Sequence, residues 1–294
     1  MKILAFGEVL WDVFSNEKTI GGAPFNFAAH AVKQGAEVDL VTALGKDSLA
    51  KETKATIKKH SVGTKYIYVS QLRSGICNVT LDSKGEPNYE LIMPVAYDDI
   101  ILSENQLDEI AATGYDCLYY GTLALRGKTS LSTLQKLIKL NCFKEILCDV
   151  NIRQEYYSAD VLTFALQNAT IAKISREEMS QVSLCLIGND VTDYVAFCHE
   201  LFSRFNRLHT IILTLDKNGA MVTEKNGNIL YSSLPVNKVV SAVGAGDSFT
   251  ATFIVSRFDG CSLKDCINRA VKVSDFVVTQ SGAVPEYIPS KLLG

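Results

Sequence analysis

The chain has 294 residues, a formal net charge of -3 at pH 7 and 47% hydrophobic residues. This length and composition are typical of a folded globular protein with one large α/β domain or two small ones. The slightly acidic charge argues against nucleic acid or an anionic membrane as the main partner, so any anionic ligand must be held by local groups.

The eight cysteines are scattered, without a Cys-x-x-Cys pair or a Cys/His grouping at zinc spacing. Several lie in apolar runs, as Cys148 does, where a small reduced core residue is the simplest role. Glu8 interrupts the N-terminal apolar run too early for a signal peptide, and no apolar run approaches membrane-spanning length. These features predict a protein of the reducing cytoplasm.

The N-terminal part of the chain alternates strand and helix patterns. Residues 3–6 read as a buried strand, and a helix over 23–34 follows a glycine pair. The next strand is expected at 38–43, followed by a helix over 47–60 whose regularly spaced lysines are most simply a solvated face.

Residues 65–96 break this rhythm with short alternating segments. Residues 76–81 and 89–93 flank a turn at 82–85, which is a β-hairpin signature. We therefore expect a small β-sheet, formed by about 12–22 and 65–96, that projects from the main body as a lid.

From residue 117 the strand-helix alternation returns. Strands are expected at 117–120, 145–150, 169–174 and 210–214, and helices near 128–140, 158–167 and 190–205. This alternation predicts an α/β fold with a mostly parallel central sheet covered on both faces. Because no repeat, low-complexity tract or linker is present, we expect residues 1–294 to form one domain with the lid.

Polar residues follow the first strand, where ligands of parallel sheets bind. Glu8 and Asp12 come first, and the pair Gly21-Gly22 then allows close backbone approach. Asn26 offers a donor and an acceptor to a polyol. Taken alone, however, this segment is better explained as a glycine-rich turn with Asn26 facing solvent.

Two further segments end strands with polar side chains. If the chain stays extended after the strand at 145–150, Asp149, Asn151 and Arg153 point the same way, although a strand-end ion pair explains them equally well. Ser175 and Glu178 have capping-box spacing, which strongly favours a helix start. A carboxylate at this place could also orient Mg²⁺ through water.

The stretch 241–249 has the clearest chemical pattern. Gly244 and Gly246 bracket Ala245 before a helical run, which predicts unpaired N–H groups at a helix N-terminus that favour an anion. Asp247 could cap the helix or act as a base beside this anion hole, and spacing alone leaves both open. No Walker A lysine follows, and no third glycine completes a dinucleotide fingerprint.

Together these segments resemble PfkB-type (ribokinase-like) sugar kinases over essentially the whole chain, and most closely the fructokinases. The motifs that carry the resemblance, in chain order, are Gly21-Gly22-Ala23-Pro24-Phe25-Asn26, Gly45-Lys46-Asp47, Gly121-Thr122-Leu123-Ala124-Leu125-Arg126, Asp149-Val150-Asn151-Ile152-Arg153 and Gly244-Ala245-Gly246-Asp247. The resemblance implies a ribokinase-like three-layer α/β/α fold.

The resemblance also implies roles for individual residues. Asp247 would be the base, with Gly244, Ala245 and Gly246 forming the anion hole and Arg153 near the transferred phosphoryl group. The sugar site would comprise Asp12, Gly21, Gly22, Asn26, Asn151 and Asp247. ATP would be bound by Lys173, Ser175, Thr214, Asp216, Gly219, Gly244, Gly246, Asn268 and Ala283, and Glu178 would support Mg²⁺.

Some positions depart from the family pattern. Ser241 stands where relatives often have an Asp near a monovalent cation, which argues against activation by K⁺. Ser175 replaces a usual Asn, Asp216 replaces a usual glycine beside the nucleotide, and Ala50 and Leu125 replace a usual glycine and glutamine. None of these departures removes the expected base or anion hole.

The function predicted from the sequence is ATP-dependent phosphorylation of a primary hydroxyl of a small sugar, with D-fructose first. The alternatives are the same chemistry on 2-keto-3-deoxygluconate, ribose or a nucleoside. From different classes, a non-catalytic sugar or nucleotide sensor and a dinucleotide oxidoreductase are the rivals. An apolar lid face could also pair two subunits as a homodimer.

Overall fold

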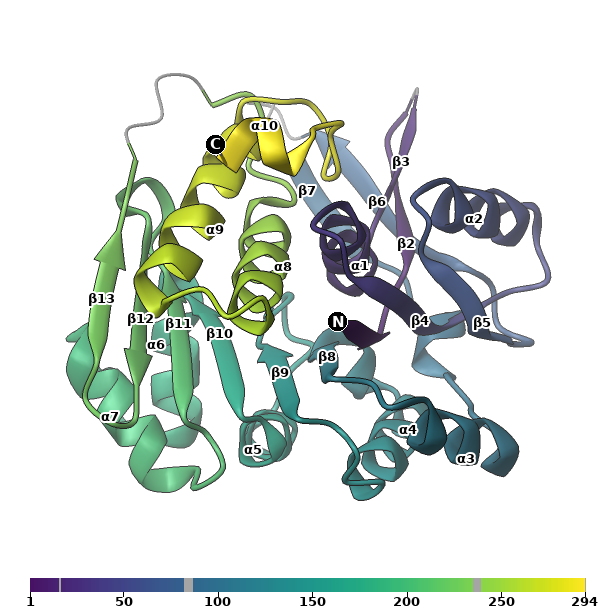
Figure 1. Ribbon diagram of the computed structural model, residues 1–294. Helices are drawn as coiled ribbons and strands as arrows, with labels where there is room; N and C mark the ends of the chain where they lie inside the picture. Colours follow the sequence, from purple (N-terminus) through teal and green to yellow (C-terminus); the bar gives the residue numbers. More distant parts are fainter. Residues whose placement is uncertain (16, 82–86, 235–238, 294) are drawn as a thin grey trace.

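A nine-stranded sheet forms the centre of the molecule, in the order β13-β12-β11-β10-β9-β8-β1-β4-β5 (Figure 1). The computed structural model describes residues 1–15, 17–81, 87–234 and 239–293. The strands are β1 (Lys2–Phe6), β4 (Glu37–Leu44), β5 (Gly63–Val69), β8 (Cys117–Gly121), β9 (Glu145–Asp149), β10 (Ile171–Ser175), β11 (Thr210–Thr214), β12 (Ala220–Glu224) and β13 (Ile229–Ser232). The seven neighbouring strands β5, β4, β1, β8, β9, β10 and β11 are parallel. The strands β12 and β13 add an antiparallel edge.

Helices cover both faces of this sheet. One face carries α1 (Ala23–Lys33), α2 (Ser48–Lys59), α8 (Ala245–Phe258) and α9 (Leu263–Val278), with the short α10 (Pro289–Leu293) beside α9. The other carries α3 (Glu104–Thr113), α4 (Lys128–Lys139), α5 (Ala159–Asn168), α6 (Arg176–Leu186) and α7 (Tyr194–Arg204). Single 3-10 turns are η1 (Ala96–Asp98), η2 (Leu123–Arg126) and η3 (Asp216–Asn218).

The central strands are buried on both sides because side chains alternate between the two layers. In β1, Ile3 and Ala5 pack under α1 and α8, whereas Leu4 and Phe6 pack toward the opposite helices. This is why the strand reads as a continuous apolar run.

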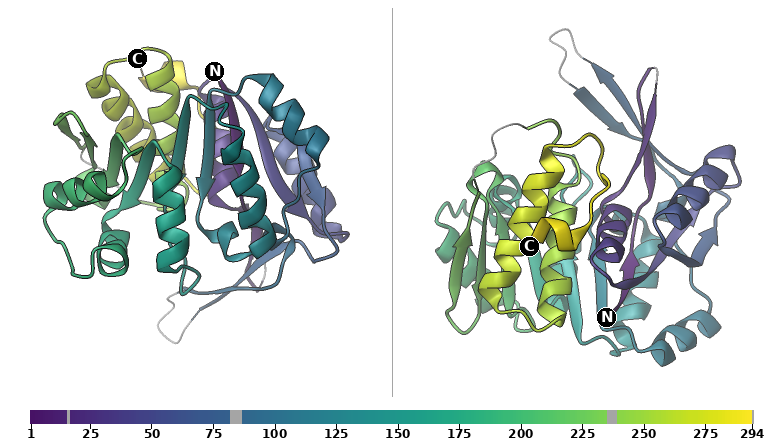
Figure 2. Two further views of the ribbon diagram at one scale, coloured as in Figure 1. Left: turned by 90° about the horizontal axis from the view of Figure 1, so that it is seen from below. Right: turned by 45° about the horizontal axis from the view of Figure 1, so that its top comes forward.

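A second, four-stranded sheet projects from the main body in the order β3-β2-β6-β7 (Figure 2, right). It contains β2 (Leu10–Val13), β3 (Lys18–Gly21), β6 (Gly75–Leu81) and β7 (Pro87–Leu91). The expected lid segment 65–96 is wrong at its start, because residues 65–69 belong to β5 and pair with β4 in the large sheet. The turn expected at 82–85 lies outside the described residues.

Two other sequence expectations concern membranes and cysteines. Across the described ranges, no helix has both the length and the apolar character needed to cross a bilayer. All eight cysteines lie in the described part of the chain and are free thiols, and Cys148 is fully buried as expected.

The contact between α1 and the large sheet includes one stacked aromatic pair. The Phe27 ring stacks on Tyr119 of β8, with centroids 3.8 Å apart and an angle of 9° between the rings, and neither side chain is exposed. The stack is one of the contacts that hold α1, which begins at the glycine pair, against the sheet.

We expect Phe27→Ala to lower the free energy of unfolding by about 3–5 kcal/mol, because it leaves a cavity between α1 and β8. Phe27→Leu keeps most of the apolar volume and should lose about half of that or less. Urea unfolding of both variants measures the difference. An unchanged unfolding midpoint for Phe27→Ala would contradict the role given to this stack.

Candidate active site

The N-terminus of α8 is built for close approach by another group. Gly244 is its N-cap with φ 82°, and a Cβ at this position would collide with the carbonyl of Ala283. A Cβ on Gly246 would lie 3.2 Å from Lys173 Nζ. Glycine therefore suits both positions. The Ala245 amide donates to the Ala242 carbonyl at 3.3 Å, whereas the Gly246 and Asp247 amides have no backbone partner in the described chain and remain available to an anion.

Asp247 lies in the first turn of α8 but does not cap it. The N-cap is Gly244, and Asp247 Oδ2 instead accepts a hydrogen bond of 2.9 Å from Asn26 Nδ2. Burial raises the pKa of Asp247 above its ordinary value, while the Asn26 bond and the charges of Lys173 and Arg153 oppose that rise. Capping is therefore the wrong interpretation of Asp247, which faces residues from elsewhere in the chain.

A buried ion pair lies beside this helix N-terminus. Lys173 Nζ is 3.1 Å from Asp149 Oδ1, and the side chains are 9% and 1% exposed. Burial raises the pKa of Asp149 to about 6, although the Lys173 charge opposes this. Burial also opposes the charge on Lys173, but nearby carboxylates raise its pKa above the ordinary value, so it stays a cation.

Ser175 and Glu178 form the capping box at the start of α6. Ser175 Oγ accepts from the Glu178 amide at 3.3 Å, and Glu178 Oε2 accepts from the Ser175 amide at 2.7 Å. The other oxygen, Oε1, accepts from the Ile152 amide at 2.7 Å. Glu178 thus ties α6 to the loop that follows β9. In the described ranges, no group of three or more His, Cys, Asp or Glu side chains could hold a metal ion.

The segment after β9 does not stay extended. The strand ends at Asp149, and Asn151 has φ 41°, which turns the chain. As a result Asp149 is buried while Arg153 is exposed, so the expectation that the 149, 151 and 153 side chains share one direction is wrong. Burial raises the pKa of both Asp12 and Asp247, and the charge of Arg153 opposes that rise.

The glycine pair places α1 against the first strand. Gly22 is the N-cap of α1 with φ 110°, and a Cβ there would lie 2.5 Å from the Glu8 carbonyl. Asn26 is 4% exposed and does not face solvent, so the plain-turn interpretation is wrong for it. Asp12 lies in β2, and a Cβ on Gly21 would be 3.5 Å from its Oδ2 atom. Of the sugar-site candidates, Asn26 is thus brought into contact with Asp247, and Asp12 lies beside Gly21.

Glu8 is a buried carboxyl that the sequence marks only as a polar residue after a strand. It is 1% exposed, and within the described chain its Oε2 has no hydrogen-bond partner. Burial raises its pKa to about 7, with the Asp247 charge adding to the rise and Arg153 opposing it. The signal that could have identified it is an acidic residue directly after a fully apolar strand.

Other nucleotide-site candidates lie along β11, β13 and α9. Thr214 ends β11, and Asp216 has φ 53°, a conformation that glycine adopts more easily. Gly219 abuts the Ser232 carbonyl, and Asn268 Oδ1 accepts from Ser232 Oγ at 2.7 Å. Ala283 instead lies against Gly244. The candidates therefore form two neighbouring groups, one at Ser232 and one at the α8 N-terminus.

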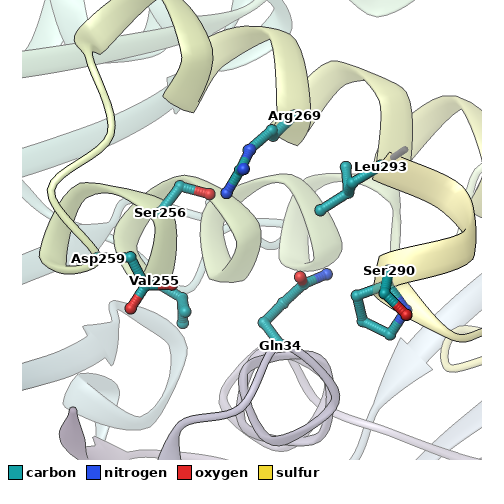
Figure 3. A pocket seen from close by; sticks show the side chains of 8 residues that line it. Gln34, Val255, Ser256, Asp259, Arg269, Ser290 and Leu293 are labelled. Atoms are coloured by element: carbon teal, nitrogen blue, oxygen red, sulfur yellow. The ribbon is translucent and has the colours of Figure 1, made fainter.

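A cavity of ≈ 280 Å³ lies elsewhere, at the opposite end of α8 from Asp247 (Figure 3). Its walls come from α1, α8, α9 and α10, through Gln34, Val255, Ser256, Asp259, Arg269, Pro289, Ser290 and Leu293. It contains none of the residues expected in the site. We therefore assign no part of the sequence-derived site to it.

Comparison with known proteins gives a consistent result. Residues 2–290 match the model of the pfkB family of carbohydrate kinases. A fructokinase of Salmonella typhimurium is 26% identical over 245 residues, covering 80% of this chain and 76% of the relative. A ribokinase of Dictyostelium discoideum is 26% identical over 286 residues, covering 91% and 86%.

The fold is also shared with solved structures. The crystal structure of a fructokinase with bound ATP from Xylella fastidiosa superimposes with a TM-score of 0.87 at 20% identity, over 99% of this chain and 97% of that one. This likeness confirms the ribokinase-like three-layer fold with its additional small sheet.

We expect Glu8→Gln to change how stability depends on pH. Because the folded pKa of about 7 lies above the ordinary 4.5, the folded state keeps a proton that the unfolded state has lost between these values. The free energy of unfolding therefore falls as the pH rises from 4.5 to about 7. Above pH 7 the loss is on the order of 3 kcal/mol. Glu8→Gln should remove this loss.

Urea unfolding at pH 5 and pH 8 tests this expectation. The free energy of unfolding of Glu8→Gln, relative to that of the wild type, should be higher at pH 8 than at pH 5. Glu37→Gln, at the exposed start of β4, is the control and should show no such gain. An equal difference from wild type at both pH values for Glu8→Gln would refute the buried, protonated state.

Proposed function

The chain belongs to the pfkB family of carbohydrate kinases, and we propose that it transfers the γ-phosphoryl group of ATP to a primary hydroxyl of a small sugar, with D-fructose the first candidate. The observation that carries the proposal is the position of Asp247. Its carboxylate lies at the glycine-rich N-terminus of α8 and is held by Asn26 from α1. A base and an anion hole therefore share one helix turn.

This arrangement suits phosphoryl transfer. Asp247 accepts the proton of the sugar hydroxyl, and burial keeps its pKa above the ordinary value, which strengthens it as a base. The N–H groups of the first α8 turn stabilise charge on the transferred group. Lys173 adds a fixed positive charge beside Gly246, and Arg153 adds an exposed one. Positioning and charge stabilisation are what this reaction needs.

ATP brings Mg²⁺, which would neutralise charge on the phosphates. Mg²⁺ keeps much of its water shell and often uses only one or two carboxylates. The residues fit such an ion without a dedicated cage, because Glu178 Oε1 and Oε2 each retain one lone pair after bonding Ile152 and Ser175. We propose that Glu178 contacts the hydrated ion through water. The serine at 241 gives no carboxylate for K⁺.

Fructose is preferred over other acceptors for two reasons. The segments 21–26, 121–126 and 149–153 resemble those of fructokinases, and a fructokinase is among the relatives with 26% identity. The ribokinase relative keeps ribose as the second candidate. A coupled ADP-release assay over fructose, ribose, 2-keto-3-deoxygluconate and adenosine, with Mg²⁺ and with or without K⁺, separates these candidates. ATP consumption on none of a broad sugar panel would favour a sensor.

Asp247→Asn should lower turnover by about 10²–10⁴-fold or more, because the amide cannot take the proton. The Kd for ATP, measured by a fluorescence titration, should stay within a few-fold of the wild-type value. The matched control is Asp265→Asn, which changes the equivalent first-turn residue of α9, where the carboxylate is exposed and bonded to Ser262. That control should keep wild-type turnover, and an active Asp247→Asn enzyme would end the assignment.

The buried pair is tested by changing both partners together, so that neither is left buried without the other. Lys173→Met with Asp149→Asn should lower kcat by about 10²–10³-fold, as expected for loss of one stabilising charge. The control changes the surface pair Lys144 and Asp116, 2.7 Å apart, in the same way. Steady-state kinetics of both double variants give the comparison. Equal kcat values would exclude Lys173 from phosphoryl stabilisation.

A further inference from the structure

His30 is a buried histidine that the proposed reaction does not use directly. It lies on α1, one turn after Asn26, and its side chain is 0% exposed. Its Nε2 is 2.9 Å from the Ala283 carbonyl oxygen, and its Nδ1 is 2.8 Å from the Tyr287 hydroxyl. Both ring nitrogens are therefore bonded to the segment that follows α9.

The partners define the tautomer. A carbonyl oxygen can only accept, so Nε2 carries the hydrogen, and Nδ1 accepts the hydrogen of the Tyr287 hydroxyl. Burial, with a smaller contribution from the charge of Lys33, lowers the pKa of His30 to about 4. The ring is therefore neutral at neutral pH, and both bonds persist.

The Ala283 carbonyl held by His30 is the same group that abuts Gly244. A Cβ on Gly244 would collide with it, so this carbonyl lies directly against the N-cap of α8. Asn26 and His30 are four residues apart on α1 and share one face of the helix. Through Asn26 that face holds Asp247, and through His30 it holds the backbone against Gly244.

We propose that His30 is a positioning residue for phosphoryl transfer: it fixes the Ala283 carbonyl against Gly244 and thereby sets the geometry of the α8 anion hole. His30 itself touches neither sugar nor ATP. The catalytic effect of His30 rests on the proposed kinase function. The packing of the Ala283 carbonyl against α8 does not depend on that function.

The hydrogen-bond chain continues outward with decreasing strength. Gln34 Nε2 lies 3.5 Å from the Tyr287 hydroxyl and 3.1 Å from Thr252 Oγ1 of α8. Gln34 also lines the cavity seen in Figure 3. A change at Gln34 should therefore disturb the anion hole much less than a change at His30.

The experiment compares His30→Leu with His30→Gln, because glutamine keeps a donor for the Ala283 carbonyl. We expect His30→Leu to lower kcat at least tenfold and raise KM for ATP several-fold, with KM for the sugar within twofold. His30→Gln should recover most of the loss, and Gln34→Leu should stay within about twofold of wild type.

The matched control is Tyr120→Phe. Tyr120 is also fully buried and donates a 2.7 Å hydrogen bond to the Ala165 carbonyl, but on the other face of the sheet. It should lose stability without any change in kcat or in KM for ATP. If His30→Leu behaves like this control, His30 contributes packing only and the proposal is overturned.

Hydrogen exchange separates this proposal from the function on which it rests. The amides of residues 248–250, of which Ser248 donates to the Gly244 carbonyl at 2.9 Å, should exchange faster in His30→Leu than in wild type and Tyr120→Phe, and His30→Gln should restore them. Unchanged exchange at these amides would overturn the role of His30 even in an active kinase. An inactive wild-type protein would instead overturn the proposed function, whatever the exchange rates.

Discussion

The site depends on the balance of charge around Lys173. Its ammonium group is buried beside Asp149, and the carboxylates of Glu178 and Asp247 raise its pKa further. Burying such a cluster is favourable only if the remaining lone pairs find donors. The Ser175 and Ile152 amides supply them to Glu178, and Asn26 supplies one to Asp247. The loop after β9 and the starts of α1, α6 and α8 are thereby held together.

This balance has a consequence for the nucleotide. Carboxylates outnumber the buried ammonium group in the cluster, so a polyphosphate would meet net negative charge without further cations. Arg153 is exposed and makes no ion pair within the described part of the chain. It is therefore available to the phosphates, and a hydrated divalent ion would supply the rest. The electrostatics thus argue for metal-complexed ATP as the donor, in agreement with the proposed reaction.

The sequence predicted the parallel strands well because they are buried on both faces and read as apolar runs. It assigned β5 to the small sheet because this edge strand is only partly buried, as hairpin strands are. At the site, the motifs located Asp247 and Asn26, but the backbone turn at Asn151 left no local signal. Neither His30 nor Glu8 could be assigned a role, because their importance comes from contacts with distant segments.

The departures from the family pattern have local explanations that leave the site intact. The extra negative charge of Asp216 is balanced by Arg176, whose Nη2 is 2.6 Å from its carboxylate. Ser175 retains the capping box, and Ser241 Oγ accepts from the Val243 amide at 3.2 Å. A non-catalytic sensor would be favoured if these three departures disrupted the site. Each of these residues is accommodated by a local contact that does not involve Asp247 or Lys173, so these departures are no evidence against catalysis.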